Sequence, residues 1–308
     1  MAVAGRDRIG WGVLGAADIA GRAVVPAIAA SRNGRLVSIA SRNAERAREL
    51  ASLHSFVRVG ASYEEVLDDP EVDAVYIPLV NSLHREWTLR SLSAGKHVLC
   101  EKPLAMNASE ADEMAGAADR ARLLLMEAFM YRFHPRTRGF VESLQHPLHT
   151  NAWFGFTLSD PSNYRARAAL GGGALLDVGC YAVSATRWIL GEPDEVFARI
   201  RRGGSGHDSV DMSVAALLHF PEGATASLWV SFESPEVQGL EVVERGATKG
   251  LEKPFTWRDT DNPYVLMVES FGRSVIEDQP LAIPTSESVA NMRVLDRIRE
   301  AGDPELSR

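Results

Sequence analysis

Two separated groups of residues have the types and spacing that proton-transfer chemistry needs. Glu101-Lys102-Pro103 directly follows a short apolar segment, and the proline restricts the backbone so that the Lys102 side chain can be aimed at a cleft. Near mid-chain, Gly171-Gly172-Gly173 precedes Asp177 and Tyr181, which are four residues apart and therefore share one helical face. A phenol has a pKa of about 10, and a nearby ammonium favours its ionised form. Lys102 and Tyr181 together predict a pair that exchanges a proton beside a bound redox cofactor.

Each of these residues also has a plain structural interpretation. A Glu-Lys-Pro triplet is by itself more often a loop ion pair, and Tyr181 could pack one side of an amphipathic helix. Asp177 either orients the substrate or the lysine, or is an acidic residue near the start of a helix dipole. Lys102 could also be the proton donor itself, because a sequence does not assign a shared proton to one owner.

The first 126 residues alternate short apolar strands with helices. The expected strands are Ile9–Leu14, Leu36–Ala40, Phe56–Val59, Ala74–Ile77, His97–Cys100 and Leu123–Met126. This alternation predicts an α/β fold with a doubly wound parallel sheet, which we take as a cofactor-binding domain over residues 1–126. Ligands of such sheets bind at the carboxyl ends of the strands, where Glu101-Lys102-Pro103 lies.

The pattern changes after residue 126. A helix runs from Gly171 to Leu190 and is followed by longer strands at Val196–Arg201, Ser213–Phe220, Ala224–Phe232 and Leu240–Val243. A closing helix is expected at about 287–301. We therefore predict an α+β domain over residues 127–308, with a mainly antiparallel sheet and helices on one of its faces.

The turn after the first strand has the context of a dinucleotide fingerprint. Gly15-Ala16-Ala17-Asp18-Ile19-Ala20 ends a strand and opens a helix with the spacing G-x-A-x-x-A. The fingerprint uses glycines for a tight turn, for close approach to a pyrophosphate and for helix packing, and two of the three are alanine here. An ordinary strand-to-helix turn is the alternative interpretation.

The end of the second strand favours NADP over NAD. The residues there are Ser41-Arg42-Asn43, and none is the acidic residue that usually binds the ribose hydroxyls of NAD. Arg42 could pair with a 2′-phosphate, with help from the Ser41 hydroxyl. A solvated arginine at a helix start is the alternative.

Composition excludes several other classes of protein. The 308 residues are 45% apolar and 24% charged, which is ordinary for a globular protein of two domains. A net charge of −8 argues against a general affinity for nucleic acid or for an anionic membrane. We expect a cytoplasmic protein, because the chain shows neither a membrane-spanning run nor a signal peptide. Cys100 and Cys180 are expected to be thiols that serve packing, and no metal site is expected.

Five segments resemble one enzyme family, the glucose-fructose oxidoreductase, inositol dehydrogenase and MocA family. They are Gly15 to Ala20, Leu79 to His84, Ala94 to Pro103, Glu127 to Pro135 and Gly171 to Tyr181. The resemblance implies a Rossmann domain followed by a C-terminal domain with a large open sheet, through which homodimers or homotetramers form. It also implies a cis bond between Lys102 and Pro103.

Many members of the family have histidine where this chain has Tyr181. The tyrosine variant is similar to glucose-fructose oxidoreductase, xylose dehydrogenases, dihydrodiol dehydrogenases and sugar 3-ketoreductases. The resemblance thus implies an NADP-dependent oxidoreductase that moves a hydride between the nicotinamide and a carbinol or carbonyl carbon of a small sugar or diol. A reductase of non-sugar carbonyl compounds and a non-catalytic NADPH-binding sensor are the alternatives.

The expected site residues fall into three groups. Those expected to bind the cofactor are Gly15, Ala17, Asp18, Ile19, Ser41, Arg42, Leu79, Asn81, His84, Glu101 and Lys102; those expected to be catalytic are Lys102, Tyr181 and Asp177; those expected to contact substrate are Tyr131, Arg132 and His134. The chain departs from the family pattern in two places: residues 139–156 lack the usual Gly-Glu turn into a strand, and residues 249–264 are short.

Overall fold

The computed structural model describes residues 7–204, 209–256 and 261–303. These residues form two compact units, which are described separately. The first holds residues 7–104, 109–134 and 261–288, and the second holds 105–108, 135–204, 209–256 and 289–303. This division differs from the boundary that we place at residue 126, because it falls at residue 134 and returns residues 261–288 to the first unit.

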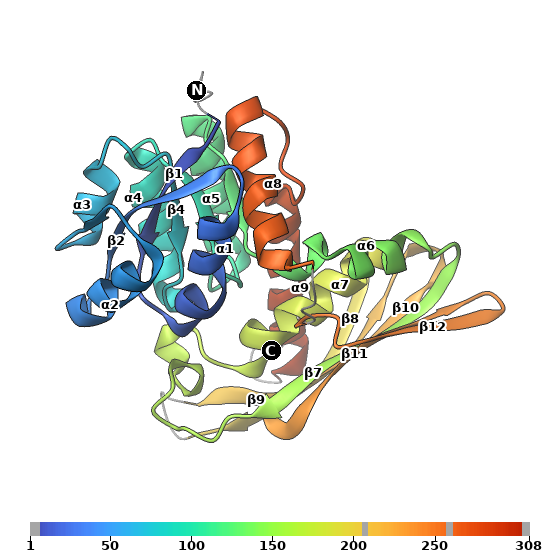
Figure 1. Cartoon of the computed structure of the whole chain (residues 1–308). Coiled ribbons are helices and arrows are strands. Elements are labelled where there is room, and N and C mark those ends of the chain that lie inside the picture. Colours follow the sequence, from blue (N-terminus) through green and yellow to red (C-terminus); the bar gives the residue numbers. More distant parts are fainter. Residues whose placement is uncertain (1–6, 205–208, 257–260, 304–308) are drawn as a thin grey trace. The chain divides into compact units, whose positions relative to one another are not determined.

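The first unit is built on a six-stranded parallel sheet with the strand order β3-β2-β1-β4-β5-β6. Its strands β1, β2 and β4 are labelled in Figure 1. Its strands are β1 (Ile9–Leu14), β2 (Gly34–Ala40), β3 (Arg58–Val59), β4 (Ala74–Ile77), β5 (His97–Cys100) and β6 (Leu125–Glu127). Every residue of β1, β4 and β5 is buried, as expected for parallel strands covered on both faces. The predicted doubly wound sheet is confirmed.

Helices and turns connect these strands. They are η1 (Ala20–Val24, π-helical), α1 (Val25–Ala30), α2 (Ala44–His54), α3 (Tyr63–Asp68), η2 (Asn81–Leu83), α4 (His84–Ser93), α5 (Ala108–Ala121), η3 (Met130–Phe133) and α8 (Pro263–Glu277). The side chain of Asn43 caps α2 by accepting from two backbone N–H groups, as its position predicts. Helix α8 covers the sheet from far along the sequence, since its Phe271 ring lies 5.4 Å from the fully buried Trp11 ring.

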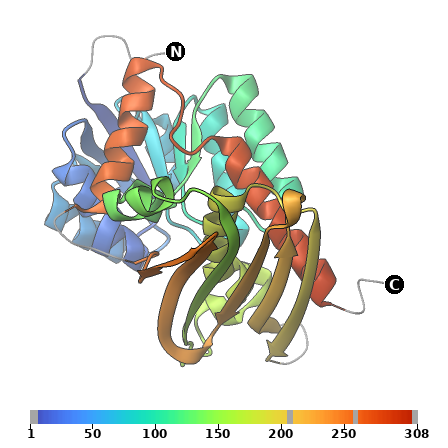
Figure 2. The ribbon, with the colours of Figure 1, turned by 90° about the vertical axis from the view of Figure 1, so that its right-hand side faces the viewer.

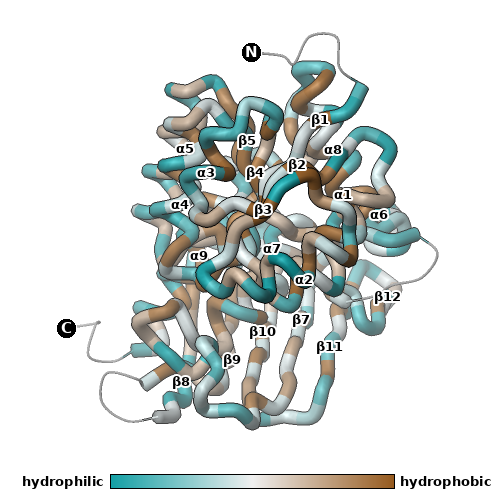
Figure 3. The backbone as a smooth tube through the Cα atoms, turned by 60° about the vertical axis from the view of Figure 1, so that its left-hand side comes forward, coloured by the Kyte–Doolittle hydropathy of each residue, from teal (hydrophilic) through white to brown (hydrophobic). Residues whose placement is uncertain are grey.

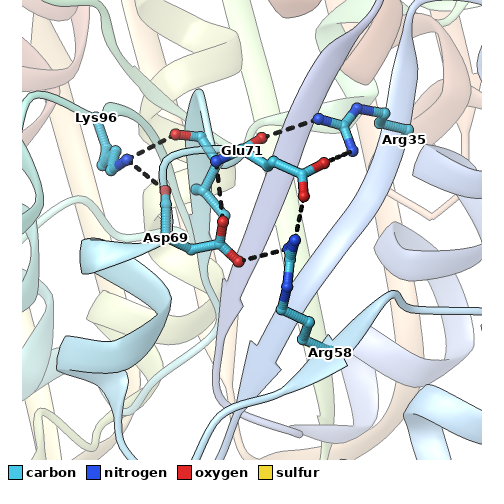
Figure 4. A network of polar contacts seen from close by, with 6 residues as sticks. Arg35, Arg58, Asp69, Glu71 and Lys96 are labelled. Carbon is cyan, nitrogen blue, oxygen red and sulfur yellow. Dashed lines mark hydrogen bonds and ion pairs between the residues drawn. The ribbon is translucent and has the colours of Figure 1, made fainter.

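A network of charged side chains fixes the edge of the sheet where the strands begin (Figure 4). Arg58 donates to the Asp69 carboxylate at 2.8 Å and also pairs with Glu71, which in turn accepts from Arg35 at 3.0 Å. The Lys96 ammonium donates to the Asp69 carbonyl at 2.8 Å. These residues tie the start of β2, β3 and β5 to the connection before β4. The candidate site residues lie at the opposite, carboxyl ends of the strands.

The second unit is built on a mixed sheet with the strand order β12-β11-β7-β10-β9-β8. Its strands are β7 (Pro147–Thr157), β8 (Glu195–Gly203), β9 (Val210–His219), β10 (Thr225–Ser231), β11 (Glu233–Glu244) and β12 (Ala247–Glu252). Only the β7–β10 pair is parallel among these described strands, so the predicted, mainly antiparallel sheet is confirmed. Strand β7 occupies the stretch that lacks the family's usual turn, and residues 257–260 of the short stretch lie outside the described residues.

Helices cover one face of this sheet (Figure 2). The helical segments are α6 (Pro135–Glu142), η4 (Tyr164–Ala166), η5 (Ala168–Leu170), η6 (Leu175–Gly179, π-helical), α7 (Cys180–Leu190), η8 (Pro221–Gly223) and α9 (Thr285–Gly302). Val183 of α7 and Ile298 of α9 meet Val214 and Val230 of the sheet. By length and composition the segment Ala168–Leu190 could cross a membrane, but 72% of its apolar window is buried, which is typical of a core helix.

The other face of the sheet carries large apolar side chains that no helix of this unit covers. Hydropathy alternates along β10, where brown segments follow paler ones (Figure 3). Phe197, Leu217 and Trp229 point away from the helices and are 54%, 40% and 38% exposed. Phe197 and Leu217 are direct partners across β8 and β9, so these side chains form a continuous patch, named the outer face below. Exposed apolar patches of this kind are typical of interfaces.

Candidate functional site

The turn after β1 has the shape that the dinucleotide fingerprint requires. Gly15 adopts a φ of +126°, and a Cβ at this position would lie 3.1 Å from a methyl carbon of Leu79. Its N–H donates to the Ala40 carbonyl at 2.8 Å, which holds the turn against the end of β2. Only glycine accepts this backbone conformation without strain. The turn therefore leaves backbone free for the close approach of a phosphate-bearing ligand.

Two arginine side chains, Arg42 and Arg46, follow the end of β2. Arg42 is exposed, and the Ser41 hydroxyl accepts from the Asn43 N–H at 3.2 Å. Burial raises the pKa of the Tyr63 phenol, and its contact with Arg42 opposes that rise. Arg46 pairs with Asp18 at 2.6 Å and so joins α2 to the turn. Arg46 and Tyr63 were not expected here from the sequence.

These residues fit a dinucleotide that carries an additional phosphate on its adenosine ribose. The glycine turn lies at the carboxyl end of β1, where open parallel sheets bind their ligands. Exposed Arg42 and Arg46 supply positive charge at the end of β2, where an NAD site usually has a carboxylate. Ala17 and Ile19 follow in the same turn and helix start. That these residues bind the cofactor stays a prediction.

His84 connects the ends of β4 and β5. Its two ring nitrogens lie 2.9 Å from the Leu79 carbonyl and 2.9 Å from the Pro103 carbonyl, and the ring is fully buried. Burial lowers the pKa of His84, while the two carbonyls oppose this effect. Asn81, in η2, is also buried. The structure thus assigns His84 a role in holding the lysine loop, and direct contact of Asn81 and His84 with the cofactor stays a prediction.

Lys102 follows β5, and buried carboxylates bond the backbone of the loop that carries it. The Lys102–Pro103 peptide bond is cis, as the resemblance implies. Glu101 accepts from the Tyr76 hydroxyl at 2.7 Å, and Glu127 of β6 accepts from the Leu104 N–H at 2.9 Å. Burial raises the pKa of Glu127 to about 7, against the opposing effect of the Lys102 charge. Lys102 itself is half-buried.

The three residues expected to contact substrate lie in or next to η3. Tyr131 and His134 are 1% and 2% exposed, and the Phe129 ring packs edge-on against Tyr131 at 5.9 Å. Arg132 pairs with Glu287 at 3.7 Å. Contact with substrate stays a prediction for all three.

The glycine-rich segment of the second unit serves close packing of backbone. The Gly173 N–H donates to the Arg165 carbonyl at 2.9 Å, and the Gly172 N–H donates to the Arg167 carbonyl at 2.9 Å. A Cβ on Gly172 would lie only 2.4 Å from the Arg165 carbonyl oxygen. The glycines therefore allow the η4–η5 loop to lie directly on the start of the helix that carries Tyr181.

Asp177 and Tyr181 lie on this helix, as predicted. The Arg165 Nε donates to the Asp177 Oδ2 at 2.7 Å, and the Asp177 side chain is only 4% exposed. The Tyr181 ring packs against Phe154 of β7 at 5.8 Å and against Phe255 at 5.4 Å, and it is 9% exposed. The sequence did not single out Arg165.

Asp211 of β9 is a second residue that the sequence analysis missed. Its Oδ2 accepts from the Leu175 N–H at 2.6 Å, at the start of the same helix. Burial raises the pKa of Asp211 to about 6. A Cβ on Gly173 would lie 2.2 Å from its other carboxylate oxygen. No sequence pattern predicted this contact, because the two residues are far apart in the chain and meet only in the folded sheet.

Lys102 belongs to the first unit and Tyr181 to the second, so their pairing stays a prediction. Cys100 and Cys180 are buried and are not joined in a disulfide. Over the described ranges, no group of three His, Cys, Asp or Glu side chains is placed to hold a metal ion.

Comparison with known proteins gives the family. The family model described as "Oxidoreductase family, NAD-binding Rossmann fold" matches residues 9–129, and the "GFO/IDH/MocA C-terminal domain" model matches residues 144–248. D-xylose 1-dehydrogenase (NADP(+)) 2 of Haloferax volcanii is 36% identical over 95% of this chain and 97% of its own. The dTDP-3,4-didehydro-2,6-dideoxy-α-D-glucose 3-reductase of Actinomadura kijaniata is 36% identical over 82% of this chain and 77% of its own.

The same fold is seen in a crystal structure of a 3-ketoreductase variant from Actinomadura kijaniata in complex with TDP-benzene and NADP. That structure superimposes with a TM-score of 0.90 at 29% identity and covers 96% of this chain and 98% of its own. The chain therefore belongs to the glucose-fructose oxidoreductase, inositol dehydrogenase and MocA family and is an oxidoreductase.

Proposed function

We propose that this protein is an NADP-dependent oxidoreductase that interconverts a carbinol and a carbonyl group of a sugar. The observation that carries the proposal is the arrangement at the carboxyl edge of the parallel sheet, where the Gly15 turn, the Arg42 cation and Lys102 follow β1, β2 and β5. The xylose dehydrogenase and the ketoreductase reported above act on sugars by name. The name of the first includes NADP, and the crystal structure of the second contains NADP. These similarities support a sugar as the substrate.

Tyr181 and Lys102 have distinct roles in this proposal. The nicotinamide, when bound, accepts or delivers the hydride at its C4 atom. Tyr181 exchanges the hydroxyl proton of the substrate through its phenol oxygen, and the positive charge of Lys102 favours the ionised phenol. Asp177 fixes the helix turn that precedes the phenol. Glu101 and Glu127 hold the loop of Lys102, and their burial keeps water from the base of that loop.

The proposal is tested with Tyr181→Phe, which removes the phenol oxygen and keeps the ring. We expect kcat to fall by about 10²- to 10⁴-fold, because positioned proton transfer contributes that much. NADPH binding, followed by fluorescence, should be unchanged. Tyr264→Phe makes the same change in α8 and is the control. Turnover close to that of the unchanged protein in Tyr181→Phe contradicts the proposal.

The substrate is identified by a screen of three compound classes. Free aldoses, nucleotide-linked ketosugars and aromatic diols are offered with NADP⁺ or NADPH, and the absorbance of the reduced cofactor is followed. We expect a sugar to give the highest kcat/KM. A preference for the diols would instead support a dihydrodiol dehydrogenase, and absence of turnover with all three would support a sensor.

The assembly and the location belong to the same proposal. We propose that two or four copies associate through the outer face of the second unit's sheet, where Phe197, Leu217 and Trp229 are exposed. A negative net charge of −8 agrees with a cytoplasmic enzyme that binds small molecules and neither nucleic acid nor a membrane.

A further inference from the structure

The second unit contains a cation that the sequence analysis did not assign to any role. Arg165, in η4, is partly buried and donates from Nε to the carboxylate of the buried Asp177 at 2.7 Å. The Tyr164 ring stacks on its guanidinium with 4.8 Å from Cζ to the ring centroid. The Asp177 side chain is only 4% exposed, and a buried carboxylate without a cation is costly, so Asp177 needs Arg165 as its partner.

The backbone around Arg165 is fixed as firmly as its side chain. Its N–H donates to the Asn163 side chain at 3.1 Å, and its carbonyl accepts from the Gly173 N–H at 2.9 Å. The absence of side chains at Gly172 and Gly173 is what lets this segment approach the helix so closely. The glycine-rich segment therefore delivers a guanidinium to the helix turn just before Tyr181.

Several groups determine the charge around the phenol of Tyr181. The loop brings Arg165 with Tyr164 stacked on it, and the helix itself brings Asp177, while β7 and the segment after β12 contribute uncharged aromatic rings. Burial alone would lower the pKa of Arg165. Asp177, Tyr164 and Tyr181 all act in the opposite direction and outweigh burial, so the pKa is raised. The guanidinium is thus charged at every working pH, and the Asp177 carboxylate that holds it lies four residues before Tyr181 on the same helical segment.

We propose that Arg165 is a positioning residue for Tyr181: it fixes Asp177, one helical turn before the phenol, and brings a positive charge to that turn. The proposal rests on the function proposed for Tyr181 and deepens it. Under this proposal the positive charge of Arg165 favours the ionised form of the phenol. Asp177 partly offsets this charge and sets its orientation.

The test is a titration of Tyr181 that needs neither substrate nor cofactor. The tyrosinate absorbance of the protein minus that of Tyr181→Phe isolates this phenol from the other tyrosines among the six of the chain. Arg165→Met should move the titration midpoint upward by about one pH unit, because a cation is lost. Asp177→Asn should move it downward, because the guanidinium then acts without its partner. A purely structural role predicts no such opposite pair of shifts.

The variants and outcomes are chosen so that the proposal can fail. Arg167→Met, at an exposed position on the same loop, should leave the midpoint unchanged. If Arg165→Met does not fold, Arg165→Gln replaces it in the comparison with Asp177→Asn, and Arg165→Lys, which keeps the charge, should keep the midpoint. Equal or same-direction shifts in the two variants overturn the proposal. Turnover in Tyr181→Phe would instead overturn the proposed function, whatever the titration gives, so the two failures are distinguishable.

Discussion

Arg42 is the residue on which cofactor preference depends in our proposal. It is exposed at the end of β2, beside the Gly15 turn, and no carboxylate occupies that place. Arg42→Asp should lower the affinity for NADP by about 10- to 100-fold, since a hydrogen bond to a charged group contributes about 1.5–3 kcal/mol. The affinity for NAD should be unchanged or higher. The measurement is the ratio of the two dissociation constants from fluorescence titration.

A matched variant makes this test specific. Arg48 is exposed on α2, one turn and a half further along, so Arg48→Asp makes the same charge change outside the proposed phosphate site. If both variants lower NADP affinity equally, general electrostatics and not Arg42 explains the preference.

Because of His97, the free energy of unfolding should fall at acid pH. Its Nδ1 accepts from the Leu124 N–H at 3.0 Å, so the ring must be neutral, and burial lowers its pKa to about 4. In the unfolded chain the His97 ring has a pKa of about 6.5 and binds a proton there, whereas in the folded protein it does so only near pH 4. The unfolded state is therefore favoured increasingly as the pH falls from 6.5 toward 4. At pH 4.5 this effect should remove about 2–3 kcal/mol of unfolding free energy.

The check compares unfolding free energies of the protein and of His97→Asn, which keeps an acceptor and does not titrate. The difference between them should shrink or reverse between pH 7.5 and 4.5. A constant difference across that range would show that His97 is not depressed in the folded state.

At the scale of elements, the start of the Tyr181 helix depends on a glycine. Gly173 has a φ of +110°, and a Cβ there would meet the Asp211 carboxylate that caps the helix. Gly173→Ala should destabilise the protein by about 1–3 kcal/mol through backbone strain alone. Thermal unfolding measures this loss. Gly139→Ala, in α6 with open space around it, is the control and should be neutral or stabilising by up to about 1 kcal/mol. A similar loss of stability in both variants would show that backbone strain at position 173 is not the cause.

The elements that the sequence predicted well are those with strong local signals. β1, β4 and β5 are short buried apolar runs, and their predicted bounds agree with the structure. The helix cap at Asn43 is likewise local, since its side chain accepts from N–H groups two and three residues ahead. The site residues that we predict at the ends of these strands rest on the same local signals, and their roles stay predictions.

The remaining elements lacked such signals. β7 was not predicted, because its polar and apolar residues alternate weakly and it is defined by pairing with β10 and β11. β11 begins well before the predicted Leu240, since its first half is exposed and polar. Arg165, Asp211 and Glu127 could not be assigned, because their partners are set by tertiary contacts between elements.

For the whole molecule, the outer face predicts how copies associate. Leu217 lies between Phe197 of β8 and Ser227 of β10, near the middle of the patch. Leu217→Arg should place a charge there and convert the oligomer to a monomer, because an unpaired charge in a contact is costly. Light scattering with size-exclusion chromatography measures the mass. Leu148→Arg, at an exposed position at the start of β7, is the control and should leave the mass unchanged. If the protein without any substitution is already a monomer, the assignment of the outer face as an interface is wrong.

The return of residues 261–288 to the first unit has a consequence for synthesis of the chain. Phe271 and Glu269 of α8 contact Trp11 and Arg32, so the cover of β1 is translated long after the strand itself. During translation, the sheet is therefore complete at residue 134 well before α8 (Pro263–Glu277) is made, and the surface that α8 covers stays open until then. A gene fragment that stops at codon 134 would therefore yield a product with a bare tryptophan, whereas co-expression with a peptide that contains α8 offers a way to restore it.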